Sequence, residues 1–229
     1  MLTPYDWQEG ISHRASYVEG RLQSGTPVIV VSVKEGILAY TMMRHMRKVY
    51  EIYDRLMFAA IGQQSDVEVI RTSALDFSHQ EGFQRSEEDV TIQRVVAALS
   101  QPLKRAFSDF NSSPFVMQAI FAEVGDTIEE DSIYLLDYDG DYSRRPKFAF
   151  LSGTQEMSDR LYQALTDLTS KEITLAQAMK ELPEIWAKAL DPEAKPADLE
   201  EDKTHALTAD IAILERNPKG EARFRSITA

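Results

Sequence analysis

TPVIVVSVKEGILA, residues 26–39, is the stretch of sequence that decides the fold. Pro27–Val33 is almost continuously apolar and rich in β-branched residues, which is typical of a strand that is buried on both faces. Lys34-Glu35-Gly36 then predicts a tight turn, and Ile37–Thr41 continues the apolar pattern beyond it. The stretch therefore predicts a buried β-hairpin.

A helix is predicted directly before this hairpin. Thr3-Pro4 supplies an N-cap residue and a proline at the first helical position. Apolar side chains then recur at spacings of four, three and four residues, which places them on one helical face. They are Ile11, Ala15, Val18 and Leu22. Ser24-Gly25 ends the pattern, so an amphipathic helix leads into the first strand.

Beyond the hairpin, strands are predicted in hairpins and helices in pairs. The order is a strand pair, two helices, three strands, two helices and a last strand pair. The predicted strands are 49–53, 56–61, 115–123, 133–137, 148–151, 209–214 and 222–227, and the helical stripes cover 67–74, 90–110, 157–168 and 175–186. This order favours an α+β fold of one domain, in which helix pairs cover two stacked sheets.

Three local signals refine the helices. Ser86 with Asp89 predicts a capped start for the second helix of the first pair, and Pro102 predicts a bend or break within it. Thr174 with Gln177 forms a capping box for the last helix.

Composition excludes several classes of function. The 229 residues carry 25 basic and 37 acidic side chains, a net charge of −12, which argues against non-specific binding to nucleic acid or to anionic membranes. The absence of cysteine excludes disulfides, thiolate metal sites and a cysteine nucleophile. No apolar stretch is long enough for a signal peptide or a membrane span, so we expect a cytoplasmic protein.

Chemical motifs are weak elsewhere in the chain, and we expect no metal and no cofactor. The four histidines lack ligand spacing, and no phosphate-binding or nucleophile-elbow motif occurs. Asp137–Asp141 departs from a calcium loop and predicts a hairpin turn at Asp139-Gly140. Arg144–Lys147 is interpreted as a salt-bridging loop, and Asp191–Lys203 as an exposed acidic loop.

Arg44-His45-Met46-Arg47-Lys48 concentrates three positive charges at the start of a strand in an otherwise acidic chain. One interpretation is a solvated strand entrance neutralised by Glu51 and Asp54. The other is a local anion site suited to a carboxylate from a partner.

The segment Lys48–Gly62, KVYEIYDRLMFAAIG, resembles the proteasome core family, whose members carry a lysine that opens a strand and a small-residue strand that ends in glycine. Residues 26–39 are similar to the first hairpin of that family, and residues 113–123, 138–140 and 151–154 are similar to its later strands and turns. The resemblance implies a four-layer αββα sandwich, the N-terminal-nucleophile hydrolase fold. It would span 1–229 as one domain, with the leading helix in 1–24 and the sandwich in 26–229.

The resemblance also offers a catalytic interpretation. Catalytic β subunits expose a threonine after cleavage of a Gly–Thr bond, and Gly25-Thr26 stands at that position. Lys48 and Asp210 match the charged partners of that threonine. The alternative function is therefore a divergent threonine hydrolase that processes itself at Gly25-Thr26.

Other features favour the α type. The position of a further catalytic acid of β subunits falls at Met42 or in a shortened connector, Tyr40–Arg47, so that acid is missing. Pro27 also stiffens the backbone beside Thr26. The sequence runs unbroken from Met1 through Gly25-Thr26, which leaves Thr26 without a free amino group. A patterned helix before the first strand marks α subunits, and the short connector resembles actinobacterial ones.

An α subunit of this kind has no catalytic residue, and the resemblance implies an architectural role. Seven copies form a ring that caps the catalytic β ring, frames the entrance for unfolded proteins and receives the C-terminal tails of ring-shaped ATPases or other activators. By this resemblance Lys48 would pair with the tail's carboxylate and Gly62 would let the tail backbone approach, while Gln63 stands where relatives carry an apolar or basic residue. Because only Met1 and Leu2 precede the predicted helix, either the pore is loosely gated or the sequence starts late.

Overall fold

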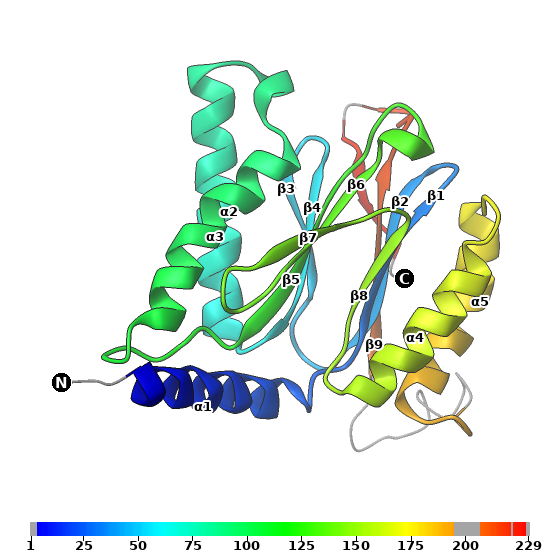
Figure 1. The fold of residues 1–229 in the computed structure, drawn as a ribbon. Coiled ribbons are helices and arrows are strands. Elements are labelled where there is room, and N and C mark those ends of the chain that lie inside the picture. The colour runs from blue at the N-terminus through cyan, green and yellow to red at the C-terminus, as the bar shows by residue number, and fades with distance from the viewer. Residues whose placement is uncertain (1–3, 195–206, 221, 228–229) are drawn as a thin grey trace.

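The hairpin predicted from residues 26–39 lies at the centre of one of two sheets (Figure 1). The computed structural model describes residues 4–194, 207–220 and 222–227. Strand β1 (Val28–Val33) pairs antiparallel with β2 (Gly36–Met43), with Val28 opposite Thr41. The turn requires its glycine, because Gly36 has φ +155° and a Cβ there would lie 2.1 Å from the Leu214 carbonyl oxygen.

Each sheet has five antiparallel strands. The first has the order β10 (Phe224–Ser226), β9 (Thr208–Glu215), β2, β1 and β8 (Phe148–Leu151). The second has the order β3 (Val49–Tyr53), β4 (Leu56–Gly62), β5 (Met117–Glu123), β6 (Ser132–Leu136) and β7 (Tyr142–Arg145). The described part of the predicted strand set therefore folds as two stacked sheets.

Continuous apolar runs in β1 and β4 arise because both faces of each sheet are covered. Val28 and Val30 face the core between the sheets, whereas Ile29 and Val31 face the helices outside. Since successive side chains of a strand point to opposite faces, a strand covered on both sides loses the polar alternation of a half-exposed strand. The interpretation of 27–33 as a doubly buried strand is confirmed.

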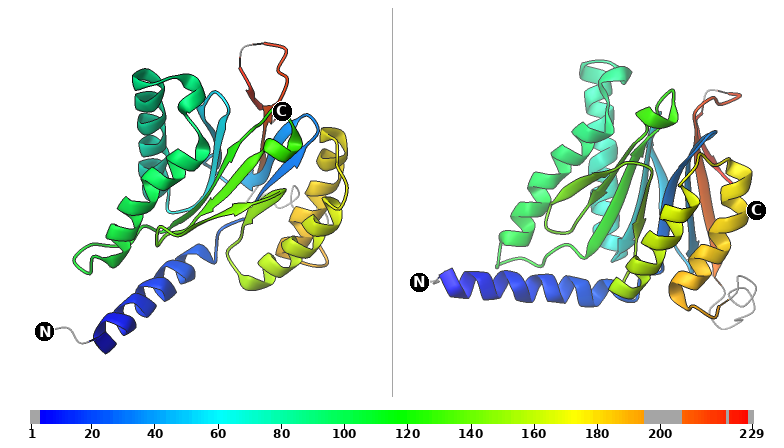
Figure 2. Two further views of the ribbon diagram at one scale, coloured as in Figure 1. Left: turned by 45° about the horizontal axis from the view of Figure 1, so that its top comes forward. Right: turned by 45° about the vertical axis from the view of Figure 1, so that its right-hand side comes forward.

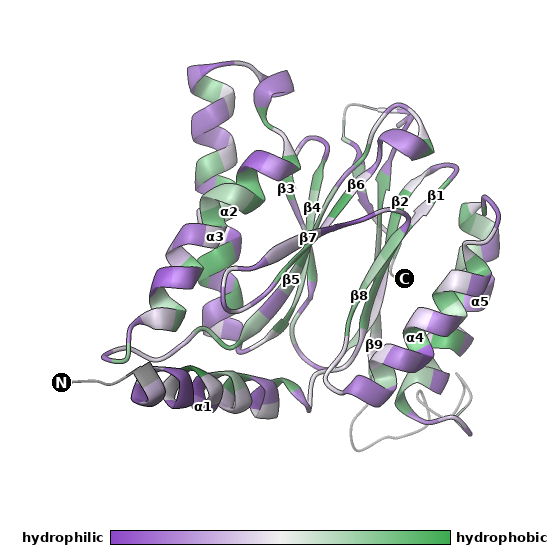
Figure 3. Cartoon of the chain, in the orientation of Figure 1, coloured by the Kyte–Doolittle hydropathy of each residue, from purple (hydrophilic) through white to green (hydrophobic). Residues whose placement is uncertain are grey.

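Helix pairs form the two outer layers (Figures 1 and 2). Helices α2 (Gln64–Gln84) and α3 (Ile92–Ser108) pack on the second sheet. Helices α4 (Gln155–Leu168) and α5 (Leu175–Leu190) pack on the first. Hydropathy follows this layering, with apolar residues concentrated along the strands (Figure 3). The predicted α+β αββα sandwich is confirmed.

The leading helix α1 (Pro4–Leu22) runs across one end of the sandwich (Figures 1 and 2). Val18 and Leu22 are buried in the core between the sheets, with Ile11 and Ala15 packed against it. This confirms the predicted apolar stripe; Thr3 lies outside the described residues.

Polar contacts also hold α1 in place. The Arg14 guanidinium donates to the carbonyl oxygens of Ala106 and Ser112, both at 2.9 Å. The Tyr138 hydroxyl donates to the Glu19 carboxylate at 2.9 Å, and burial raises the pKa of Tyr138, so it remains a donor. Because charge-assisted bonds of this kind are the stronger ones, α1 is an integral part of the sandwich.

Several local predictions need correction. Residues 142–145 form the edge strand β7, so Arg144 and Arg145 lie in a strand rather than in the predicted loop. The turn at Asp139-Gly140 joins β6 to β7, as predicted for a hairpin. Charged side chains are common on edge strands because they discourage pairing with other chains.

The predicted start of the second helix was also wrong. Ser86 precedes a short 3₁₀ turn, Glu87–Asp89, which ends at Asp89, and α3 begins only at Ile92. Pro102 lies within α3, which continues through it. The Thr174–Gln177 capping box is confirmed. Most of the predicted acidic loop, from residue 195 to 203, lies outside the described residues.

Candidate functional site

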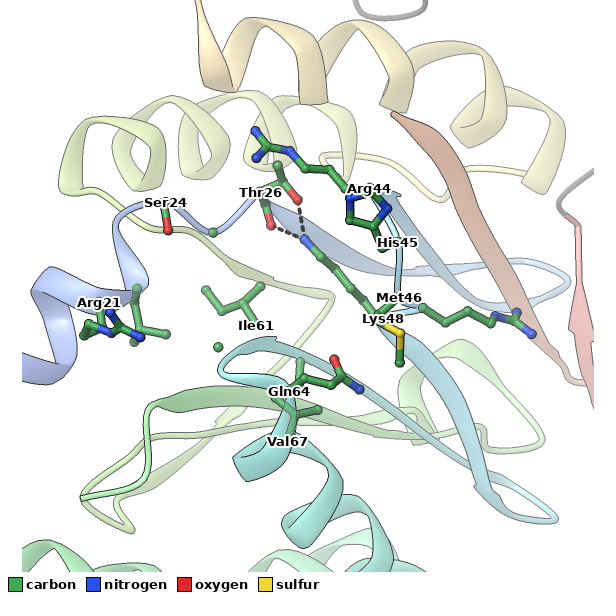
Figure 4. A pocket seen from close by; sticks show the side chains of 15 residues that line it. Arg21, Ser24, Thr26, Arg44, His45, Met46, Lys48, Ile61, Gln64 and Val67 are labelled. Carbon is green, nitrogen blue, oxygen red and sulfur yellow. Dashed lines mark hydrogen bonds between the residues drawn. The ribbon is translucent and has the colours of Figure 1, made fainter. Parts of the chain in front are cut away.

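A pocket of about 290 Å³ opens where the end of α1, the end of β4 and the connector between β2 and β3 meet (Figure 4). It is lined by Arg21, Leu22, Ser24, Gly25, Thr26, Arg44, His45, Met46, Arg47, Lys48, Ala60, Ile61, Gly62, Gln64 and Val67. Thus the basic cluster singled out in the sequence meets the residues before β1.

Asp210 on β9 fixes the start of β3, where Lys48 stands. Its buried carboxylate accepts hydrogen bonds from the backbone N–H of Lys48 at 2.7 Å and of Val49 at 3.1 Å. The Arg47 Nε donates to the same carboxylate at 3.3 Å. Because Asp210 satisfies two backbone donors at the strand entrance, it orients Lys48 through the main chain.

The Lys48 ammonium points at Thr26 (Figure 4). It donates to the Thr26 carbonyl oxygen at 2.8 Å and also to the Thr26 hydroxyl. Burial, opposed by the charge of Asp210 and assisted by that of Arg44, lowers the pKa of Lys48 to about 8. The ammonium form still predominates at neutral pH. An ammonium has three donors, so one N–H has no acceptor among the described residues.

The Thr26 hydroxyl accepts from Lys48 and donates its own proton to the Met42 carbonyl oxygen at 3.0 Å. A hydroxyl that acts as nucleophile needs an adjacent base. In the described contacts the hydroxyl faces the Lys48 amine and the Met42 carbonyl oxygen.

The residues of the catalytic interpretation are thus only partly brought together. Thr26 and Lys48 make direct contact, whereas the described bonds of Asp210 go to the Lys48 backbone and not to its ammonium.

Gly62 and Gln63 fall on different sides of the strand end. Gly62 lines the pocket, and its φ of +135° places a Cβ within 2.1 Å of the Val116 carbonyl oxygen, so the fold itself requires glycine there. Gln63 lines a separate depression with Tyr17 and Asp66, and its side chain donates to Ser65. Gln64, which was not predicted as a site residue, lines the pocket in its place.

The interpretation in which Glu51 and Asp54 neutralise the basic cluster was wrong, because no ion pair among the described residues joins either carboxylate to it. Arg47 pairs with Asp210, and Asp54 lies 3.7 Å from Arg223.

The sequence also did not indicate Arg21 as a residue of this pocket. A basic residue in the last turn of a helix is favourable by itself because it complements the helix dipole, so its position carried no functional signal.

Within residues 4–194, 207–220 and 222–227, no group of three or more metal-ligating side chains occurs. No helix in this part of the chain is long and apolar enough to cross a membrane.

Comparisons with known proteins agree with the geometry. A family model described as "Proteasome subunit" matches residues 23–198, well over half of the chain. The chain is 27% identical to proteasome subunit alpha of Acidothermus cellulolyticus, over 98% of this chain and 94% of the relative. It is 29% identical to that of Thermobifida fusca, over 93% and 82%, and 30% identical to that of Actinosynnema mirum, over 89% and 76%.

The fold is an αββα sandwich of two helix-covered antiparallel sheets, and Thr26 and Lys48 meet beside the end of α1. The chain belongs to the proteasome subunit family, and its likeness to these relatives is to the α type.

Proposed function

We propose that seven copies of this chain form the outer ring of a proteasome core particle in the cytoplasm. The ring caps a ring of catalytic β subunits, frames the entrance for unfolded proteins and contributes no catalytic residue. The observation that carries this proposal is the packing of α1. Its last two turns bury Val18 and Leu22 in the core between the sheets, so the segment before Thr26 is built into the sandwich.

The pocket supports a second part of the proposal, the docking of C-terminal tails from ring-shaped ATPases or other activators. Lys48 presents one unused N–H beside an apolar wall of Ile61 and Val67, and the terminal carboxylate of a tail would accept from it. A hydrogen bond between two charged groups contributes about 1.5–3 kcal/mol. Gly62 also lines this pocket, and in the proposed complex the tail backbone would lie beside it.

Co-purification tests the assembly. A β subunit that begins with threonine should accompany this chain, and electron microscopy should show rings capping the β ring. Intact-mass measurement distinguishes the hydrolase alternative, because loss of residues 1–25 or capture of Thr26 by an epoxyketone would contradict the α-type role. Rings that form only without a co-expressed β subunit would contradict the capping role.

A Lys48→Ala variant tests the docking. It should leave the rings intact and abolish stimulation of peptide hydrolysis by a tail peptide. Lys34→Ala is the matched control, since Lys34 is an exposed lysine paired with Glu172 on another part of the surface. Unchanged stimulation in Lys48→Ala would refute docking at this pocket.

A further inference from the structure

The pocket at the end of α1 carries more positive charge than one terminal carboxylate can neutralise. Four of its lining residues are cationic, namely Arg21, Arg44, Arg47 and Lys48. The described lining contains neither aspartate nor glutamate, although the chain as a whole has a net charge of −12. Such a local excess of one sign favours an anionic ligand.

Two of the four cations are already engaged. Arg47 donates to Asp210 at 3.3 Å, and Lys48 uses two donors on Thr26. By contrast, the described contacts of the chain give the guanidinium groups of Arg21 and Arg44 no hydrogen bond or ion pair. Both side chains are exposed and lie at different ends of the pocket (Figure 4).

Arg44 lies close enough to Lys48 for its charge to act on the ammonium. The negative charge of Asp210 also acts on the Lys48 ammonium. This carboxylate is buried, and it already accepts hydrogen bonds from two backbone N–H groups and from Arg47. Arg44 and Lys48 are therefore neighbouring positive charges at the pocket, and an anion with two carboxylates would supply an acceptor to each.

The two cations also differ in what they bind. A guanidinium matches a carboxylate through two parallel hydrogen bonds, whereas an ammonium acts as a point charge. One residue with both a terminal and a side-chain carboxylate would supply an acceptor to each. The wall formed by Ile61 and Val67 then receives an apolar side chain from the residue before it.

We propose that this pocket selects peptide tails that end in an acidic residue preceded by an apolar one. The terminal carboxylate lies on Lys48, the side-chain carboxylate lies on Arg44, and the apolar side chain packs on the wall. This rests on the proposed docking function and adds the chemistry of the partner's last two residues.

Three short peptides of otherwise equal sequence test the proposal on the assembled full-length chain. They end in Leu-Glu, in Leu-Gln, and in Leu-Glu with a C-terminal amide. Fluorescence anisotropy at low salt should show that the Leu-Gln peptide binds about tenfold more weakly than Leu-Glu. In Arg44→Gln this difference in affinity should disappear, while the Leu-Glu peptide with a C-terminal amide should still bind more weakly than the one with a free carboxylate.

Arg105→Gln is the matched control. It removes the same charge from an exposed arginine of α3 outside the pocket lining, and it should preserve the tenfold difference. Equal binding of the Leu-Glu and Leu-Gln peptides to the wild-type chain would overturn this inference while leaving the docking function in place.

Two further outcomes are decisive. If none of the peptides binds to intact rings, both the docking function and its specificity are refuted. If Arg44→Gln disrupts the rings in native mass spectrometry and leaves the tenfold difference unchanged in the rings that remain, Arg44 serves contacts between copies and the inference is wrong.

Discussion

Asp131 and Asp210 are both buried carboxylates, and each binds cationic or N–H donors near one end of β9. Asp210 lies near the start of β9, and the partner of Asp131 directly follows its end. Asp131 pairs with Arg216, whose guanidinium donates to its two oxygens at 2.8 and 2.9 Å. Arg216 also donates to the carbonyl oxygens of Gly125 and Thr127, each at 2.7 Å. Both partners are buried, so this cluster is closed to solvent.

Asp210 is as deeply buried, but the Lys48 ammonium beside it lines a pocket. Its acceptor sites are used by the backbone of β3 and by Arg47, and the Lys48 ammonium lies in a pocket with a donor unused. The closed cluster holds its charges inside the fold, whereas the open one leaves an ammonium donor unused at a pocket. The difference lies in how many donors remain after the protein's own acceptors are satisfied.

Breaking the closed cluster should have the largest effect on stability. Arg216→Met leaves the Asp131 carboxylate buried without its charged partner, and we expect a loss of about 3–5 kcal/mol in the free energy of unfolding. Urea denaturation of the full chain measures it.

Arg225→Ala is the control, because Arg225 pairs with Glu215 nearby but is half exposed, so its loss should cost about 0–1 kcal/mol. Arg216→Lys should fall between the two, because it keeps the charge but loses the fork of donors. A loss below about 1 kcal/mol in Arg216→Met would show that the closed cluster does not stabilise the fold in the manner described.

The closed cluster was not predictable from the sequence, although the strands around it were. Apolar runs such as Pro27–Val33 predict buried strands, because consecutive residues of such a strand are all buried and therefore apolar. Asp131 and Arg216 lie 85 positions apart and belong to no periodic pattern, so nothing local indicates that they pair. The strand β7 was missed for a related reason, since its exposed edge carries polar residues without alternation.

The affinity of the Lys48 pocket for a tail should depend on pH. An anion bound at Lys48 raises the pKa of the ammonium above its value of about 8 in the empty pocket, so binding takes up a proton at higher pH. Tail affinity should therefore be greatest below pH 8 and fall above it, approaching about tenfold per pH unit.

Titration calorimetry with the Leu-Glu peptide checks this profile. Asp210, Arg44 and His45 are the charged and titratable neighbours of Lys48, and His45→Gln is the control for the histidine. Lys48→Arg should bind without an inflection near pH 8, because arginine stays charged. An inflection that persists in Lys48→Arg would assign the titration to another group.

The candidate site was only partly predictable. The sequence showed a basic cluster at 44–48, and the family resemblance singled out Thr26, Lys48 and Asp210 as a group. Arg21 and Gln64 join them only because α1 ends beside the end of β4. That meeting is a property of tertiary packing, which spacing along the chain does not record. Roles for these side chains therefore had to come from their contacts.

Removing the Thr26 hydroxyl should have the smallest effect and refines the comparison most closely. Thr26→Val keeps the shape and the carbonyl oxygen but removes one acceptor from Lys48. A lost hydrogen bond of about 0.5–1.5 kcal/mol predicts tail binding about 2- to 10-fold weaker. Loss of an acceptor for the charged form also lowers the pKa of Lys48, so the pH inflection should move to lower pH.

Thr26→Ser separates this role from packing, because it keeps the hydroxyl and loses only a methyl group. It should retain both the affinity and the inflection of the wild-type chain. If Thr26→Val also retains both, the backbone carbonyl alone orients Lys48. The open site would then resemble the closed one in relying on main-chain acceptors, and it would differ only in the donor that remains unused.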